Sequence, residues 1–346
     1  MLNENILFMN LSQLAKELNL SISAVSKALR DSHEISPATK ALVIAKAKEL
    51  NYQVNPFASG LRKQKTKTIA VVVPEIDNNF FALAINGIES VAQEKGYHVL
   101  IYLTHEDMQK EVGTTKLLQN GRVDGIIISL SSQTSNTDHL QELKDKELPM
   151  VFFDRVAENI NCPKVTTDDY ESGYIGTEHL IKNGCKRISF LSISNNLSIS
   201  NKRISGYFDA LNKNGLKIDT QLILQCGLDE EKNKEQISKL LKKKNRPDAI
   251  FASVEKLALD TYQVCNELGI SIPNDIKVLG YSNLKTADLL RPSLSTITQP
   301  AYEIGRESAS ILFKLIEKKG FNIILEKTTI TSSLTERNST KTAYSI

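Results

Sequence analysis

The chain has 346 residues, of which 41% are hydrophobic and 24% charged, the balance of a globular protein with room for two or three domains. No apolar run approaches a membrane span and the first residues, MLNENILFMN, do not resemble a signal peptide, which excludes a membrane or exported protein and favours the cytoplasm. The net charge of +3 hides an asymmetry, because residues 1–67 carry ten Lys and Arg against five Asp and Glu, a balance that suits contact with a polyanion.

Three short helices are predicted in the first fifty residues. The second contains LSISAVSKAL (20–29), whose polar face carries only hydroxyl groups and positive charge. Asn19 separates it from the first helix, and Ser21 can cap it. The third helix begins with the cap and proline pair Ser36-Pro37. Two short helices with so tight a connection are typical of a helix-turn-helix, whose second helix is placed to enter a DNA groove.

A basic linker follows the three helices. Asn55-Pro56 repeats the cap and proline signal, but the sequence up to residue 67 offers barely two helical turns, and Gly60 costs such a helix about 1 kcal/mol relative to alanine. We therefore expect 55–67 to be a hinge that is disordered until a partner orders it. An exposed leucine beside four basic residues, Leu61, is expected to be buried in DNA or in a partner helix.

From Thr68 onward, apolar strand-like runs alternate with amphipathic helices. This alternation predicts parallel sheets covered on both faces, and its repetition after residue 167 predicts two doubly wound α/β lobes. Helices are expected near 81–95, 108–120, 137–146, 170–183, 201–214, 231–243, 256–268 and 302–318.

Ligands of doubly wound lobes bind beyond the carboxyl ends of the strands. The residues that follow the expected strands are polar and rich in hydroxyl groups, which favours a small polyhydroxylated or otherwise polar ligand. They are Asp77 to Phe81, Ser129, Asp154, Arg155, Asp168, Ser192, Glu255 and Ser282.

The motifs resemble one known family. The run NLSQLAKELNLSISAVSKALRDSHEISPATKALVIAKAKELNYQVNPFASGLRK is similar to the DNA-binding head and hinge of the lactose-repressor (LacI/GalR) family of transcriptional regulators. The later runs VVVPEIDNNFFALAINGIE, FFDR, KRISGYFDAL, IPNDIKVLGYSN and RPSLSTITQP resemble its periplasmic-binding-protein-like core. The expected organisation is a head at 1–54, a hinge at 55–67, a core at 68–335 with an N-lobe (68–165 and 299–325) and a C-lobe (166–298 and 326–335), and a polar tail at 336–346.

The resemblance implies roles for residues of the head. Residues 21–30 correspond to the recognition helix, in which Ile22 and Ser23 select operator bases and Lys27 makes a further base contact. Leu61 matches the hinge leucine that wedges into the minor groove and kinks the duplex. Phosphate contacts are implied for Asn10, Ser21, Ser26, Ser36 and Asn51.

The resemblance also implies an effector cleft. Many members carry Asn-Asp where this chain has Val254-Glu255, and an aspartate where it has Ser282. The carboxylate that grips sugar hydroxyls is therefore expected from Glu255, which is one methylene longer than aspartate. The other implied ligand contacts are Phe81, Asp154, Arg203 and Ser282, with Ser129 and Gln299 as further positions.

Residue patterns alone leave alternatives open. Ile22 fits a core position as well as a groove contact, and Phe81 fits the core as well as stacking on a ligand. Arg203 is expected in the first turn of a helix, where its charge opposes the helix dipole. That placement suggests an anionic or hydroxylated partner, but a salt bridge would explain it too. Asp168-Asp169 is expected to cap the helix near residue 170.

These features predict a ligand-responsive transcriptional regulator, most simply a repressor, that binds near-palindromic operator DNA as a homodimer. Its effector would be a small polar molecule, a sugar or a sugar derivative, coupled reciprocally to operator binding through the hinge. No leucine heptads follow Ser333, so we expect no tetramerising helix.

Two rival classes remain. One is an enzyme or transport protein on the same fold, although we find no catalytic residues, phosphate loop, metal cluster or cofactor motif. The other is a regulator controlled by a protein partner, with a degenerate cleft. The cysteines have no CxxC or zinc spacing and are expected to be reduced thiols: Cys162, Cys185, Cys226 and Cys265.

Overall fold

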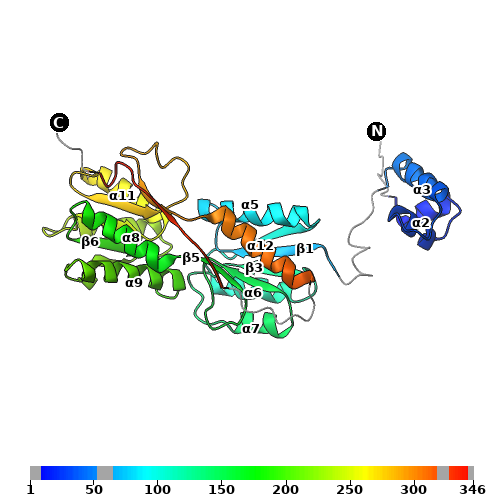
Figure 1. Cartoon of the computed structure of the whole chain (residues 1–346), viewed down its shortest axis with the longest axis horizontal. Helices are drawn as coiled ribbons and strands as arrows, with labels where there is room; N and C mark the ends of the chain where they lie inside the picture. The colour runs from blue at the N-terminus through cyan, green and yellow to red at the C-terminus, as the bar shows by residue number, and fades with distance from the viewer. Residues whose placement is uncertain (1–8, 53–64, 318–326, 342–346) are drawn as a thin grey trace, which may run out of the picture. The chain divides into compact units, whose positions relative to one another are not determined.

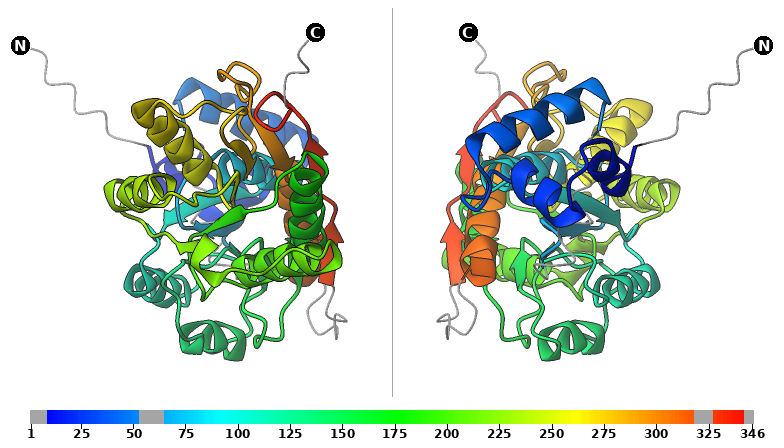
Figure 2. Two further views of the ribbon diagram at one scale, coloured as in Figure 1. Left: turned by 90° about the vertical axis from the view of Figure 1, so that its left-hand side faces the viewer. Right: turned by 90° about the vertical axis from the view of Figure 1, so that its right-hand side faces the viewer.

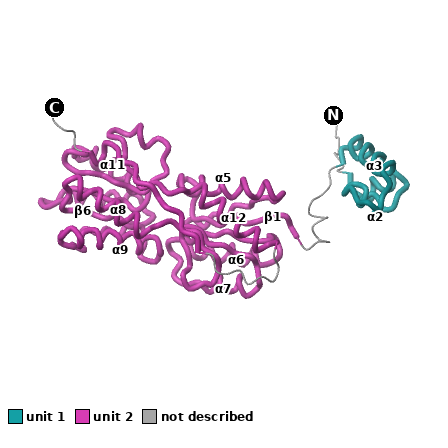
Figure 3. The backbone as a smooth tube through the Cα atoms, viewed as in Figure 1, with its two compact units in different colours: residues 1–64 teal, residues 65–346 magenta. Residues whose placement is uncertain are grey.

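The computed structural model describes residues 9–52, 65–317 and 327–341. Two compact units divide the chain, residues 1–64 and 65–346 (Figure 3). The predicted hinge lies largely outside the described residues, and so does Leu61, whose expected role stays a prediction.

The first unit is a three-helix head, α1 (Leu11–Glu17), α2 (Ile22–Leu29) and α3 (Pro37–Glu49). Each helix begins with a side-chain cap, because Asn10, Ser21 and Ser36 accept the backbone N–H of the residue three positions on. Such caps satisfy amide donors that the first turn leaves unpaired. A small apolar core joins the three helices through Leu14, Ala15, Val25, Ala28, Val43 and Ala47.

The N-lobe of the second unit is a six-stranded sheet in the order β11-β5-β4-β3-β1-β2, and every pair in it is parallel (Figure 1). Its strands are β1 (Thr68–Val73), β2 (His98–Leu103), β3 (Gly125–Ile128), β4 (Met150–Phe153), β5 (Lys164–Thr167) and β11 (Lys327–Ile330).

Helices cover both faces of the N-lobe sheet, as the unbroken apolar sequence of β1 requires. Ile69, Val71 and Val73 pack with α5 (Asn79–Glu94) and α12 (Ala301–Glu317). The alternate residues Ala70 and Val72 pack on the other side with α6 (Met108–Leu118) and α7 (Asp138–Asp145).

The C-lobe sheet has the order β12-β10-β9-β8-β6-β7. Helices α10 and α11 lie on one side of the sheet and α8 and α9 on the other (Figure 2), and each pair shares an apolar cluster with the sheet. The elements are α8 (Asp169–Lys182), β6 (Ile188–Ser192), α9 (Ser198–Lys213), the 3₁₀ helix η1 (Thr220–Leu222), β7 (Ile223–Gln225), α10 (Glu230–Leu241), β8 (Ala249–Ala252), α11 (Glu255–Leu268), β9 (Lys277–Tyr281), β10 (Ser295–Thr298) and β12 (Ser333–Thr335).

The end of the chain differs from the expectation in three respects. Strand β11 pairs with β5 and so belongs to the N-lobe sheet, whereas its residues were assigned to the C-lobe. Strand β12 pairs antiparallel with β10, so the C-lobe sheet is not wholly parallel. The predicted polar tail is partly built into the C-lobe, since the Ser339 hydroxyl donates to the Val278 carbonyl at 2.6 Å and accepts the Ser295 amide at 2.7 Å.

Candidate functional site

The head presents the start of α2 to solvent. Ile22 is 50% exposed, and Ser23 is exposed beside it, so the core alternative for Ile22 is wrong. Lys27 is partly exposed on the same helix and forms an ion pair with Glu34. Ser26 accepts a hydrogen bond from the Arg30 guanidinium at 2.9 Å.

Four of the five implied phosphate contacts are exposed, and Ser26 is partly exposed. Asn10, Ser21 and Ser36 are the caps of the three helices, and Asn51 lies just beyond α3 with a left-handed backbone, φ 50°. A helix N-terminus carries unpaired N–H groups and partial positive charge, which favours phosphate oxygens.

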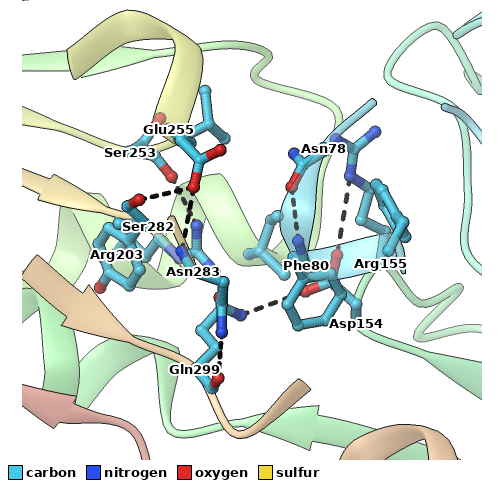
Figure 4. Close-up of a pocket in the computed structure, with 14 residues that line it drawn as sticks. Asn78, Phe80, Asp154, Arg155, Arg203, Ser253, Glu255, Ser282, Asn283 and Gln299 are labelled. Carbon is cyan, nitrogen blue, oxygen red and sulfur yellow. Dashed lines mark hydrogen bonds and ion pairs between the residues drawn. The ribbon is translucent and has the colours of Figure 1, made fainter. Parts of the chain in front are cut away.

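The second unit holds a pocket between the two lobes (Figure 4). Most of the lining residues end or follow strands or lie at the starts of helices, so the carboxyl ends of both sheets face the same space. They are Asn78, Phe80, Phe81, Asp154, Arg155, Ile199, Arg203, Ser253, Val254, Glu255, Tyr281, Ser282, Asn283 and Gln299.

Arg155 is the buried cation of the N-lobe side. It follows β4, and its Nη1 donates to both carboxylate oxygens of Glu106, at 2.7 and 2.8 Å. Burial opposes the charge on Glu106, but Arg155 and the amide of Ser132 outweigh it, so the pKa of Glu106 lies below its ordinary value. The guanidinium also faces the ring of Phe81, 5.4 Å from the centroid.

Arg203 is the buried cation of the C-lobe side, only 2% exposed. Its Nε donates to Asp169 at 2.9 Å, its Nη1 donates to the Ser253 carbonyl at 2.7 Å, and the guanidinium lies 3.8 Å from the centre of the Tyr281 ring. Burial opposes its charge, yet Asp169, Tyr281 and Asp154 outweigh it and raise the pKa of Arg203.

The structure corrects two expectations around this arginine. Helix α9 begins at Ser198, so Arg203 lies in its second turn and the helix-dipole argument does not apply. Asp168 and Asp169 make no cap hydrogen bond at α8. Instead Asp169 pairs with Arg203, and Asp168 accepts the Ser332 amide at 2.8 Å, which ties together two segments that cross between the lobes.

A glycine allows this ion pair to form. Gly173 faces α9 from α8, and a Cβ atom there would stand 2.4 Å from the backbone oxygen of Arg203. Only glycine permits so close an approach, which brings Arg203 beside Asp169 at the start of α8.

Asp154 lies between the two arginines. Its backbone is left-handed, with φ 56°, which turns the chain sharply at the end of β4. Burial raises the pKa of Asp154, although Arg155 and Arg203 act in the opposite direction. The amide of Gln299 donates to it at 3.4 Å from a segment that crosses between the lobes.

Glu255 has both carboxylate oxygens occupied. Oε2 accepts the Ser282 hydroxyl at 2.6 Å and the Asn283 amide at 3.1 Å, and Oε1 accepts the side-chain amide of Asn79 at 2.6 Å. The predicted pair Glu255 and Ser282 therefore does meet at the pocket, but in bonds to protein groups.

Within the described part of the chain, four buried polar atoms of the pocket residues have no hydrogen-bond partner. Buried polar groups are almost always hydrogen-bonded. Two of the four are cationic donors, one is a hydroxyl and one is an amide oxygen: Arg155 Nε, Arg203 Nη2, Ser253 Oγ and Asn283 Oδ1.

The structure brings six of the seven expected effector residues to the pocket, and Ser129 is the exception. Its hydroxyl lies behind the pocket and accepts the Arg155 amide at 3.4 Å. Ser253, Asn283 and Tyr281 line the pocket without having been singled out. Ser253 and Asn283 adjoin the ends of β8 and β9, so the strand-end rule could have included them.

The described residues hold no cluster of His, Cys, Asp and Glu suited to a metal ion. None of the helices within the described ranges has the length and apolarity to cross a membrane. The pocket offers hydrogen bonds from charged and neutral groups.

Known protein families include one that matches the second unit. The family model described as periplasmic binding proteins and sugar binding domain of LacI family matches residues 66–338. Catabolite control protein A of Priestia megaterium is 29% identical over 307 residues, which are 88% of this chain and 92% of that protein.

Two solved structures extend the comparison. A LacI family transcriptional regulator from Enterococcus faecium with bound ribose is 28% identical, with a TM-score of 0.70 over 79% of this chain and 98% of its own. The lac repressor dimer bound to operator and an anti-inducer is 20% identical and shows the fold alone, with a TM-score of 0.83 over 96% of this chain and 99% of its own. The predicted fold class, a helical head before two α/β lobes, is confirmed. The chain belongs to the LacI family of DNA-binding transcriptional regulators.

Proposed function

We propose that this regulator is a repressor that binds a near-palindromic operator as a homodimer and responds to a small uncharged polyhydroxylated effector, a sugar or sugar derivative, held between the lobes of its core. The observation that carries the effector proposal is the set of four unpartnered buried atoms among the pocket's described residues. They combine donors with an acceptor, and a hydroxyl group can satisfy either kind.

The charges around the pocket favour an uncharged ligand. Arg155 and Arg203 are each paired with a carboxylate behind the pocket, Glu106 and Asp169 respectively. Asp154 and Glu255 add negative charge at the lining itself, so a further anion would meet more repulsion than attraction. The related Enterococcus faecium regulator holds ribose, a neutral sugar, which supports this class of ligand.

A ligand panel tests the effector proposal. Thermal unfolding of the full chain would be followed with ribose and cellobiose, and with ribose 5-phosphate and gluconate as anionic counterparts. A ligand present at 100 times its Kd stabilises the protein by about 2.7 kcal/mol. We expect a neutral sugar to raise Tm and the anions not to, and stabilisation by the anions alone would overturn the proposal.

The DNA part of the proposal rests on the exposed face of α2. We propose that Ile22 and Ser23 select bases, that Lys27 adds a base contact, and that five further residues of the head contact phosphate: Asn10, Ser21, Ser26, Ser36 and Asn51. An isoleucine side chain can contact the thymine methyl group in the major groove. Leu61 keeps its predicted role as the minor-groove wedge.

Selection from random DNA tests this assignment. Ile22→Asn with Ser23→Ala should change the preferred half-site, because the new amide favours adenine. The control is Leu42→Asn on α3, where an equally exposed apolar residue lies outside the predicted reading positions. An unchanged half-site in the double variant would refute the role of both residues.

The homodimer proposal has support in the N-lobe. Strand β2 is the last strand of its sheet, and it exposes the apolar side chains of Leu100 and Ile101. An exposed apolar edge strand is a site for association in folded proteins. Leu100→Glu with Ile101→Lys should shift the sedimentation of the full chain from dimer to monomer, and an unchanged dimer would place the interface elsewhere.

A further inference from the structure

The carboxylate of Glu255 joins the two lobes directly across the pocket. Glu255 is the first residue of α11 in the C-lobe, and Asn79 is the first residue of α5 in the N-lobe. The amide of Asn79 donates to Glu255 Oε1 at 2.6 Å, while Ser282 and Asn283 hold Oε2 from the C-lobe side.

Further bonds between the lobes accompany this contact. The Ser194 hydroxyl of the C-lobe donates to the Ser132 carbonyl of the N-lobe at 3.0 Å. Lys202 Nζ on α9 lies 2.8 Å from Glu158 Oε1 in the N-lobe. The lysine pair is exposed and so contributes little. The Asn79–Glu255 bond is partly buried and charge-assisted, which makes it the stronger of the interlobe contacts named here.

We propose that Glu255 is a positioning residue which, with Asn79, forms a clasp that holds the two lobes closed over the pocket, and that it does not serve as a ligand carboxylate. The inference rests on the proposed effector site and assigns Glu255 a different role there from the one the family resemblance implies. Three donors already converge on this carboxylate, which leaves at most one of its about four acceptor positions, on Oε1, for a ligand.

The clasp makes a specific prediction about charge. In Asn79→Asp a second carboxylate faces Glu255 at hydrogen-bond distance, and repulsion should open the lobes. Adding Glu255→Gln should close them again. The new glutamine can donate a hydrogen bond from its Nε2 to the aspartate, and its Oε1 can accept the Ser282 hydroxyl and the backbone N–H of Asn283. Asn79→Ala removes the bond without repulsion and should open the lobes less.

Paired spin labels measure the opening in the full chain. The labels would be attached at Asp77→Cys and Lys285→Cys, which are exposed on opposite lobes near the clasp. The native cysteines at 162, 185, 226 and 265 are buried and should escape labelling. Labelled protein would be diluted with unlabelled chain, so that each measured distance lies within one protomer.

We expect a short, narrow distance distribution in the parent protein, a longer and broader one in Asn79→Asp, and the short one again in Asn79→Asp with Glu255→Gln. Asn212→Asp, an exposed position on α9, makes the same charge change away from the clasp and should leave the distance unaltered. The proposal is overturned if Asn79→Asp and Asn79→Ala both match the parent, or if the double variant stays as open as Asn79→Asp. These distances need no effector, so a failure of sugars to bind would count against the proposed function alone.

Discussion

Each lobe brings one buried arginine to the pocket, and the two are held in similar ways on different elements. Arg155 and Arg203 each pair with a carboxylate and face an aromatic ring, Phe81 and Tyr281 respectively. The N-lobe arginine stands in the turn after a strand, whereas its C-lobe counterpart stands within helix α9. The comparison shows how two lobes of like architecture can reach the same local chemistry from unlike positions.

The difference lies in which nitrogen is left for a ligand. Among the described residues, the buried nitrogen of Arg155 without a hydrogen bond is Nε, which is close to the stem of the side chain and 3.9 Å from Asp154 Oδ2. In Arg203 the buried nitrogen without a hydrogen bond is Nη2, at the end of the side chain. We therefore expect the C-lobe arginine to contribute more to effector affinity, and the N-lobe arginine to contribute more to the order of the cleft.

The sharpest test replaces each arginine by lysine, which keeps the charge but lacks the planar fork of five donors that a guanidinium presents. Arg203→Lys should weaken binding of the sugar that the parent binds best by about 100-fold, or about 2.7 kcal/mol. Arg155→Lys should weaken it by about tenfold, or about 1.4 kcal/mol. Isothermal titration calorimetry measures both affinities. A larger loss for Arg155→Lys than for Arg203→Lys would contradict the expectation that Arg203 contributes more to effector affinity.

The N-lobe arginine, Arg155, should contribute to the free energy of unfolding through its ion pair with Glu106. Glu106→Gln removes the charge that compensates Arg155 and should lower the free energy of unfolding by about 2 kcal/mol at pH 7. Since the pKa of Glu106 is lowered in the folded protein, its contribution is full above its unfolded pKa and is lost as pH falls through the folded value. The deficit of the variant should therefore shrink in acid.

Urea unfolding at pH 7 and in acid measures this effect. Glu317→Gln serves as the control, because Glu317 forms an exposed ion pair with Lys95 at 2.8 Å and such pairs contribute about 0.5 kcal/mol or less. A deficit for Glu106→Gln that grows as pH falls would contradict the assignment.

The contribution of Asp154, between the two arginines, to the free energy of unfolding should depend on pH in the opposite direction to that of Glu106. Its pKa is raised by burial, so the folded protein binds its proton more tightly than the unfolded chain and its contribution to stability falls as pH rises through that window. Asp154→Asn should therefore be more stable than the parent at pH 7, by about 1 kcal/mol, with no gain in strong acid.

Asparagine also tolerates the left-handed backbone at residue 154, so this change adds little strain. The same variant should lose effector affinity, because it no longer offers a carboxylate to hydroxyl groups. A loss of stability at neutral pH would show that Asp154 acts mainly as a structural partner of the arginines.

Strand ends account for what the sequence alone could predict of this site. Alternating apolar strands and helices place Asp154, Glu255 and Ser282 just past β4, β8 and β9, and the structure finds all of them at the pocket. Arg203 lies on a helix face with no such rule. The family resemblance pointed to it, and so did a helix-dipole argument that the structure does not support. The head was predictable because capping and apolar spacing are local properties of short helices.

The contacts and strand pairings that the sequence did not predict join residues far apart in the chain. Asn79 and Glu255 are 176 positions apart, and no local pattern joins them. Asp169 looked like a helix cap because it adjoins the start of α8, but the close approach at Gly173 gives it Arg203 as a partner. Strands β11 and β12 are short and only partly buried, so pairing with β5 and β10, rather than periodicity, defines them.

Ser129 provides the smallest and most discriminating test of the pocket boundary. It adjoins the end of β3 as Asp154 adjoins β4, yet its hydroxyl accepts the Arg155 amide and does not line the pocket. Ser129→Ala should cost about 1 kcal/mol of stability for one long hydrogen bond. Calorimetry should show effector affinity within twofold of the parent, whereas Ser253→Ala, which removes an unpartnered hydroxyl of the pocket lining in the described structure, should weaken it several-fold. Equal losses would mean that the N-lobe side of the pocket extends past Arg155 to β3, and that the two arginines flank the ligand instead of one of them closing its site.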